Sequence, residues 1–76
     1  MTVTASEVRS AQFREKLRGY APDDVDAALE AIAAKLDRGE TLRRSDVEAL
    51  EFGTRLRGYH PQDVDAFIDR LRQEAR

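Results

Sequence analysis

The chain has 76 residues, of which 37% are charged and 41% are hydrophobic, and it contains no cysteine. This length allows one small domain with a thin core, and the lack of cysteine excludes disulfides and thiolate metal sites. The net charge of −2 argues against general nucleic-acid binding, and no apolar run reaches the roughly 18 residues of a membrane span. The opening ten residues do not resemble a signal peptide, so we expect a cytoplasmic protein.

One segment occurs twice with a constant offset of 39 residues. FREKLRGYAPDDVDAALEAI at residues 13–32 returns as FGTRLRGYHPQDVDAFIDRL at residues 52–71. Between residues 6–32 and 45–71, 12 of 27 paired positions are identical. Such repetition indicates two copies of one structural unit. We therefore predict a single small domain over residues 1–76, with repeat 1 at about 3–38 and repeat 2 at about 42–76.

Each unit is predicted to be a short helix, a tight turn and a longer helix, which makes an all-α fold of four helices. The first short helix begins near Thr4, where Thr4 and Glu7 fit a capping box. Ser45 and Glu48 give the same signature in the second unit. The short helix of the first unit is expected to continue to Phe13.

The repeated LRGY is interpreted as the turn between the two helices of each unit. Gly19 and Gly58 lie where one helix must stop, and glycine adopts the left-handed conformation without steric cost. Pro22 and Pro61 suit the first turn of the following helix, and the acidic residues after them favour the positive end of its dipole. The predicted turn residues are Gly19, Tyr20, Gly58 and Tyr59. We expect both tyrosines to belong to the core.

The longer helices carry apolar residues at spacings of three and four, a stripe typical of helix packing over about two heptads. The predicted packing residues are Val25, Leu29, Ile32, Leu36, Val64, Phe67, Ile68 and Leu71. Residues 22–37 and 61–75 pair either in parallel, so that one chain mimics a dimer, or antiparallel. A homodimer that exchanges units would also complete the core.

The ordered combination of phenylalanine, Arg-Gly-Tyr, acidic positions and Val-Asp before an apolar stripe resembles the N-terminal domain of the DivIVA family, and both units show it. The resemblance implies a non-enzymatic cytoplasmic protein of Gram-positive bacteria or actinobacteria. Such proteins bind the inner face of curved membrane at poles or septa and recruit other proteins. No residue pattern indicates a catalytic site, a cofactor or a metal, because the acidic residues after Pro22 lack the spacing of a calcium loop.

In the family, the residue before Arg-Gly-Tyr inserts into lipid beside basic residues that attract phosphates. Carried onto this chain, the resemblance gives Leu17 and Leu56 as inserting residues, where the family usually has phenylalanine. The basic neighbours are Lys16, Arg18, Arg55 and Arg57. Arg14, Arg43 and Arg44 are further cations close to the repeated LRGY in the sequence.

Each of these residues also has a plainer interpretation. The two leucines would pack against their own helices, and the two arginines of the repeat would form ion pairs with Asp24 or Asp63. Exposure of Leu17 and Leu56 separates the alternatives, since inserting residues must be exposed.

Three classes of function remain open. The first is a DivIVA-like binding module of cell division or polar growth, which engages an anionic membrane surface or a DivIVA-type or other division protein. The second is a soluble helical interaction module without lipid binding. The third, a helix-turn-helix DNA binder, is disfavoured because APDDVDAA follows the turn and would repel phosphate.

Overall fold

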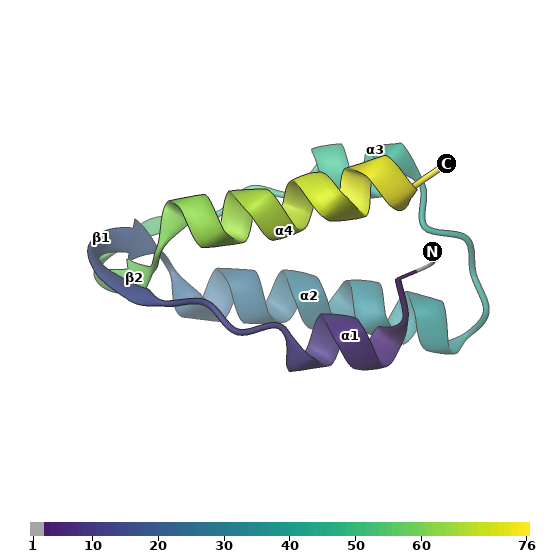
Figure 1. The fold of residues 1–76 in the computed structure, drawn as a ribbon, viewed down its shortest axis with the longest axis horizontal. Helices are drawn as coiled ribbons and strands as arrows, with labels where there is room; N and C mark the ends of the chain where they lie inside the picture. The colour runs from purple at the N-terminus through teal and green to yellow at the C-terminus, as the bar shows by residue number, and fades with distance from the viewer. Residues whose placement is uncertain (1–2) are drawn as a thin grey trace.

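The computed structural model describes residues 3–76, which form two units of helix, strand and helix (Figure 1). The elements are α1 (Ala5–Ser10), β1 (Glu15–Tyr20), α2 (Pro22–Asp37), α3 (Arg44–Glu48), β2 (Thr54–Tyr59) and α4 (Pro61–Glu74). The molecule is elongated, with principal extents of 36 × 19 × 19 Å. Both strands lie at one end, which we call the head, and residues 38–43 lie at the other, the far end (Figure 1).

The prediction of an all-α fold is wrong, because residues 15–20 and 54–59 are strands and not turns. The short helices also end early, α1 at Ser10 and α3 at Glu48, so that Phe13 lies outside the helix. In each unit a non-helical segment, 11–14 or 49–53, leads into the strand. The strand residues pair with residues of the other unit, and a non-local pairing of this kind leaves no local pattern in the sequence.

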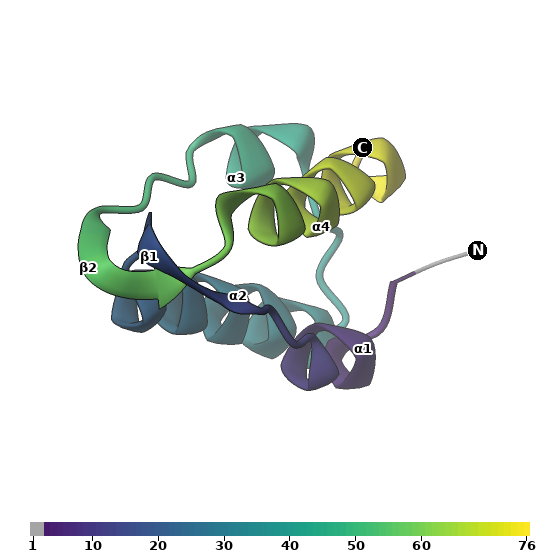
Figure 2. The ribbon, with the colours of Figure 1, turned by 60° about the vertical axis from the view of Figure 1, so that its left-hand side comes forward.

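The two strands cross in an irregular two-stranded sheet (Figure 2). The register runs from Glu15 opposite Tyr59 to Tyr20 opposite Thr54, so residue numbers fall along β2 as they rise along β1, which is the antiparallel order. The five pairs of this order follow one constant register, and one further pair, Tyr20 with Tyr59, joins equivalent residues in the parallel sense. The antiparallel pairs map onto one another when the units are exchanged, so a pseudo-two-fold axis passes through the crossing.

Close approach at the crossing explains the repeated glycines. A Cβ on Gly19 would lie 2.3 Å from the carbonyl oxygen of Tyr59, and a Cβ on Gly58 would lie 2.3 Å from that of Tyr20. Neither glycine has a positive φ, whereas Arg18 has a φ of 59°. The predicted left-handed turn at these glycines is therefore wrong, and they are needed because another backbone touches them.

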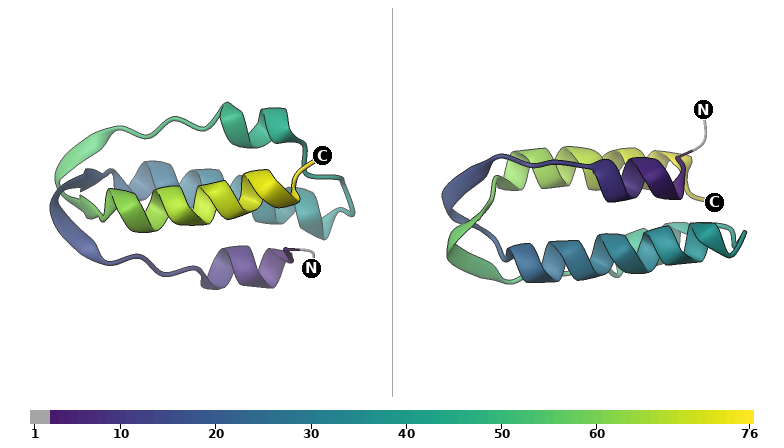
Figure 3. Two further views of the ribbon diagram at one scale, coloured as in Figure 1. Left: turned by 45° about the horizontal axis from the view of Figure 1, so that its top comes forward. Right: turned by 90° about the horizontal axis from the view of Figure 1, so that it is seen from below.

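The long helices α2 and α4 lie side by side and run in parallel from the head to the far end (Figures 1 and 3). Residues 38–43 join the units at the far end, where Gly39 adopts a φ of 74°. There the N–H of Arg44 donates to the carbonyl of Arg76 at 2.7 Å. The chain returns to the head through α3 and residues 49–53, so the connector never has to span the length of a helix.

The core lies between the helices and is apolar. Of the predicted packing residues, Val25, Leu29, Ile32, Val64 and Leu71 are buried. Leu36, Phe67 and Ile68 are half-buried and pack against them. Both predicted turn tyrosines are likewise half-buried against this cluster.

The helix starts agree only in part with the sequence. Thr4 caps α1 as predicted, because its hydroxyl accepts the N–H of Glu7 at 3.2 Å. The cap predicted at Ser45 is wrong: α3 begins at Arg44, and the carboxylate of Asp46 accepts the N–H of Arg43 at 3.0 Å. The aspartate thus satisfies a free amide two residues earlier than the expected box.

Candidate functional site

The crossing is held first by hydrogen bonds between the tyrosines and aspartates of opposite units. The hydroxyl of Tyr20 donates to Asp65 and that of Tyr59 donates to Asp26, both at 2.8 Å. The bond to Asp65 and then burial raise the pKa of Tyr20, whereas burial and then the bond to Asp26 raise the pKa of Tyr59. The two hydroxyls therefore remain protonated donors near neutral pH.

Two further aspartates bind the backbone of the opposite unit. Asp24 accepts the N–H of Gly53 at 2.8 Å, and Asp63 accepts the N–H of Arg14 at 3.1 Å. Asp63 also accepts two guanidinium N–H groups of Arg14, at 2.8 and 2.9 Å. The guanidinium, followed by the backbone N–H, holds the pKa of Asp63 well below its usual range. These carboxylates therefore join the units, which is more than the helix-dipole role expected for them.

Ala21 and His60 precede the two long helices, and the same inter-unit contacts explain why poor helix caps occupy these positions. Their N–H groups donate to the carbonyls of Gly53 and Arg14, at 2.8 and 2.6 Å. Ala21 is 1% exposed, so a larger capping side chain has no room. Of these two residues, His60 caps its helix with its side chain, which accepts the N–H of Gln62 at 3.3 Å.

Aromatic rings reinforce the crossing from both sides. Phe13 packs on Tyr59, and Phe52 packs on Tyr20, each pair with ring centroids 5.3 Å apart. We refer to these inter-unit contacts as the clamp. Its residues are Phe13, Gly19, Tyr20, Asp24, Asp26, Phe52, Gly58, Tyr59, Asp63 and Asp65. Sequence reasoning missed the clamp as a unit, although every one of these residues is repeated.

Leu17 and Leu56 lie on the strands, two residues before the clamp glycines, and are exposed. Their exposed fractions are 66% and 74%, and they are the large exposed hydrophobic residues of the part of the chain that the structure describes. Packing against their own helices is therefore excluded. Such exposure is what the membrane-inserting interpretation of the two leucines requires.

Four cations flank the two leucines along the strands. Lys16, Arg18, Arg55 and Arg57 are all exposed. Within residues 3–76 none of the four forms an ion pair. The expected pairing of the repeated arginines with Asp24 or Asp63 does not occur, since those carboxylates belong to the clamp. We call the six residues Lys16, Leu17, Arg18, Arg55, Leu56 and Arg57 the tip.

The tip concentrates positive charge in a chain that is negative as a whole. The two strands hold the four cations and one anion, Glu15, which sum to +3, against −2 for the entire chain. The other cations near LRGY in the sequence do not add to this charge. Arg14 is paired with Asp63, and Arg43 and Arg44 lie at the far end, where Arg44 contacts Arg76.

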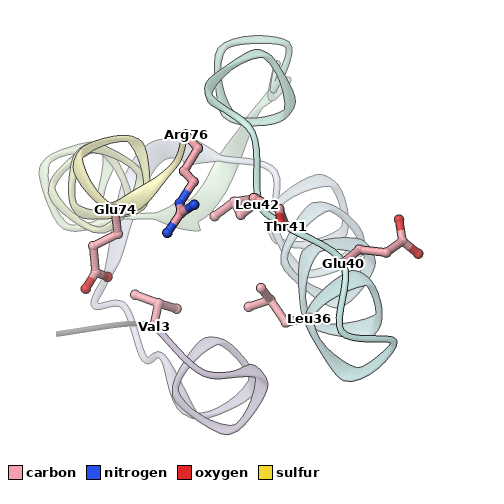
Figure 4. A pocket seen from close by; sticks show the side chains of 7 residues that line it. All are labelled: Val3, Leu36, Glu40, Thr41, Leu42, Glu74 and Arg76. Carbon is pink, nitrogen blue, oxygen red and sulfur yellow. The ribbon is translucent and has the colours of Figure 1, made fainter.

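A separate hollow of about 300 Å³ opens at the far end (Figure 4). Val3, Leu36 and Leu42 contribute apolar side chains, and Arg76 points into the space between them (Figure 4). In the lining, Thr41 forms no side-chain hydrogen bond with Glu40 or Glu74, so the hollow shows no paired nucleophile and general base. Within residues 3–76 no cluster of three or more potential metal ligands is found. We therefore take the tip and not this hollow as the candidate functional site.

None of the helices of residues 3–76 combines the length and the apolar character that crossing a membrane requires.

Comparison with known proteins gives one partial similarity. The chain is 47% identical over 34 residues to the cell cycle protein GpsB of Levilactobacillus brevis. The matched segment is 45% of this chain and 29% of that protein. No family model matches the chain, and no solved structure matches it. The similarity supports the DivIVA resemblance over part of the chain and does not address the tandem arrangement.

Proposed function

We propose that this chain is a non-enzymatic DivIVA-like module of cell division, built from two tandem units, that attaches to the anionic inner surface of the cell membrane through its tip. The observation that carries the proposal is the exposure of Leu17 and Leu56 next to four cations that form no ion pair within residues 3–76. Partial similarity to a cell cycle protein supports the link to cell division.

Binding of this kind is weak and depends on salt. A fully buried leucine contributes about 1.5–3 kcal/mol, and a basic residue near anionic lipid contributes about 1 kcal/mol. Two partly inserted leucines and four cations therefore give a reversible attachment. Because salt screens exposed charges, the attachment weakens as ionic strength rises.

The competing functions have less support. A soluble module that pairs with another DivIVA-type head through its long helices would need free apolar faces, but the buried residues of α2 and α4 already belong to one shared core. A helix-turn-helix DNA binder would need basic residues at the start of α2. That helix begins instead with Asp23 and Asp24, which repel phosphate.

Flotation with vesicles tests the proposal directly. The wild-type chain and the double variant Leu17→Ser/Leu56→Ser are mixed with vesicles that contain anionic lipid, at low and at high salt. We expect the wild type to float at low salt, to bind less at high salt, and to lose at least about tenfold in binding when both leucines are replaced. The variant should keep its melting temperature, because neither leucine contributes to the core.

A matched charge control uses cations at the two ends of the molecule. Arg18→Gln/Arg57→Gln should weaken flotation, whereas Arg43→Gln/Arg44→Gln removes the same charge at the far end and should change it little. Failure of the wild type to float at low salt would sink the proposal. Equal losses in the two arginine pairs would show that net charge acts without a defined site.

A further inference from the structure

Residues of both units meet at a shallow hollow on the head. It is lined by Glu15, Lys16, Leu17 and Arg57 and has a volume of about 250 Å³. Leu17 and Arg57 are direct partners in the strand register. The leucine of one unit therefore lies beside an arginine of the other, and neither unit alone contains this arrangement.

The pseudo-two-fold axis places a second set of residues on the other side of the crossing. Its members are the equivalents Thr54, Arg55, Leu56 and Arg18. In the strand register Leu17 is opposite Arg57, and Gly19 is opposite Arg55. Arg18 and Leu56 lie between these two pairs, so Arg18 is beside Leu56.

The two sets differ in charge at one position. The set around Leu17 holds Lys16 and Arg57 but also Glu15, and therefore sums to +1. The set around Leu56 holds Arg18 and Arg55 with a neutral threonine in place of the glutamate, and therefore sums to +2. Glu15 is exposed, and within residues 3–76 it forms no ion pair that would neutralise it.

We propose that the tip holds two unequal sites for the phosphate of an anionic lipid headgroup, that the site around Leu56 is the stronger, and that Glu15 weakens the site around Leu17. The inference rests on the proposed function, because it describes how that membrane contact is divided. Guanidinium groups suit phosphate oxygens through paired hydrogen bonds. A carboxylate in the same hollow repels the phosphate at short range.

Single substitutions at equivalent positions test the inequality. In vesicle flotation at low salt, Leu56→Ser should lower binding more than Leu17→Ser, although the two changes are chemically the same. Glu15→Gln should raise binding about fivefold, the change expected for one unit charge close to an anionic surface. In the Glu15→Gln background the two serine variants should become nearly equal.

Two controls separate a local effect from net charge. Glu48→Gln removes an exposed carboxylate on α3, away from the head, and should change binding less than twofold. Thr54→Glu gives the second set the charge of the first and should lower binding about fivefold. Vesicles of zwitterionic lipid should bind none of these variants, and inorganic phosphate should displace the protein from anionic vesicles no more than sodium chloride of the same ionic strength does.

The outcomes distinguish the two proposals. Absence of wild-type flotation overturns both of them. If the wild type floats but Glu15→Gln and Glu48→Gln have equal effects, the membrane proposal stands and the proposal of unequal sites is overturned. The same conclusion follows if the two single leucine variants lose binding equally. Displacement by inorganic phosphate beyond that caused by sodium chloride of the same ionic strength would also overturn a site for lipid headgroups.

Discussion

The clamp and the tip are neighbours in the chain and both are repeated, yet they differ in what their side chains contact. In the clamp, Tyr20 and Asp65 satisfy each other across the units, and so do their equivalents. In the tip, Leu17 and Arg18 are exposed, and Arg18 forms no ion pair in the part of the chain that the structure describes. Repetition alone therefore does not identify a functional residue, since it also marks residues that hold the fold.

The contrast predicts opposite behaviour of the two regions under substitution. Changes in the clamp should lower stability, and any effect on membrane binding should follow from unfolding. Changes in the tip should alter membrane binding and leave stability intact. The leucine and glutamate variants described above probe the tip, and the substitutions that follow probe the clamp.

The largest loss of stability is expected for Gly19→Ala or Gly58→Ala. The new Cβ of residue 19 would lie 2.3 Å from the carbonyl oxygen of Tyr59 and 2.6 Å from the carbonyl carbon of Gly58. Both contacts are with backbone, so the strands would have to move apart. Overpacking typically costs about 1–3 kcal/mol and sometimes more, which is a large part of the stability of so small a domain. Urea unfolding followed by circular dichroism measures the loss.

Gly53→Ala is the matched control for that loss. Its new Cβ would meet only the carboxylate oxygen of Asp24, at 3.1 Å, and a side chain can shift. We expect a much smaller decrease in the free energy of unfolding than for Gly19→Ala. Equal decreases would show that the close backbone contact at the crossing does not cause the loss of stability in Gly19→Ala.

A smaller effect is expected when the tyrosine hydroxyls are removed. Tyr20→Phe and Tyr59→Phe each delete one bond of 2.8 Å and keep the ring that packs on phenylalanine. Each change should cost about 1 kcal/mol, and because both bonds join the same two units the double variant should deviate from additivity. Thermal melting of both single variants and the double variant measures this. A double variant as stable as the wild type would contradict the role of the clamp.

The helical part of the fold was largely visible in the sequence. The stripe that begins at Val25, the prolines at the first helical position and the cap at Thr4 are local signals, and the helices follow them. The strands were missed because their pairing joins residues about 40 positions apart. A glycine between two helical patterns also has two interpretations, a left-handed turn or a close approach, and the sequence does not separate them.

The site was visible only in part. The position before Arg-Gly-Tyr pointed to Leu17 and Leu56 through the family resemblance, but their exposure required the structure. Arg43 lies close to LRGY in the sequence but is not part of the tip, because α3 begins at the far end. The clamp role of Asp24 was hidden, since an acidic residue in a first helical turn already has a sufficient local explanation.

The smallest effect concerns pH. Because Arg14 holds the pKa of Asp63 below its usual value of about 3.9 in the folded state, protonation of Asp63 favours the unfolded chain. The stability from this pair is therefore complete above about pH 4 and is lost as the pH falls further.

Arg14→Gln removes the main cause of the lowered pKa, so the variant should be less stable near neutral pH and should lose less stability on acidification. The backbone N–H of residue 14 still donates to Asp63, and Lys35 still lowers the pKa of Asp46, so part of the dependence should remain. Unfolding free energies between about pH 2.5 and 7 measure the slope. Arg44→Gln, which removes a charge without this pairing, should keep the wild-type slope. If Arg14→Gln kept it too, the carboxylate of Asp63 would not be a source of the acid sensitivity.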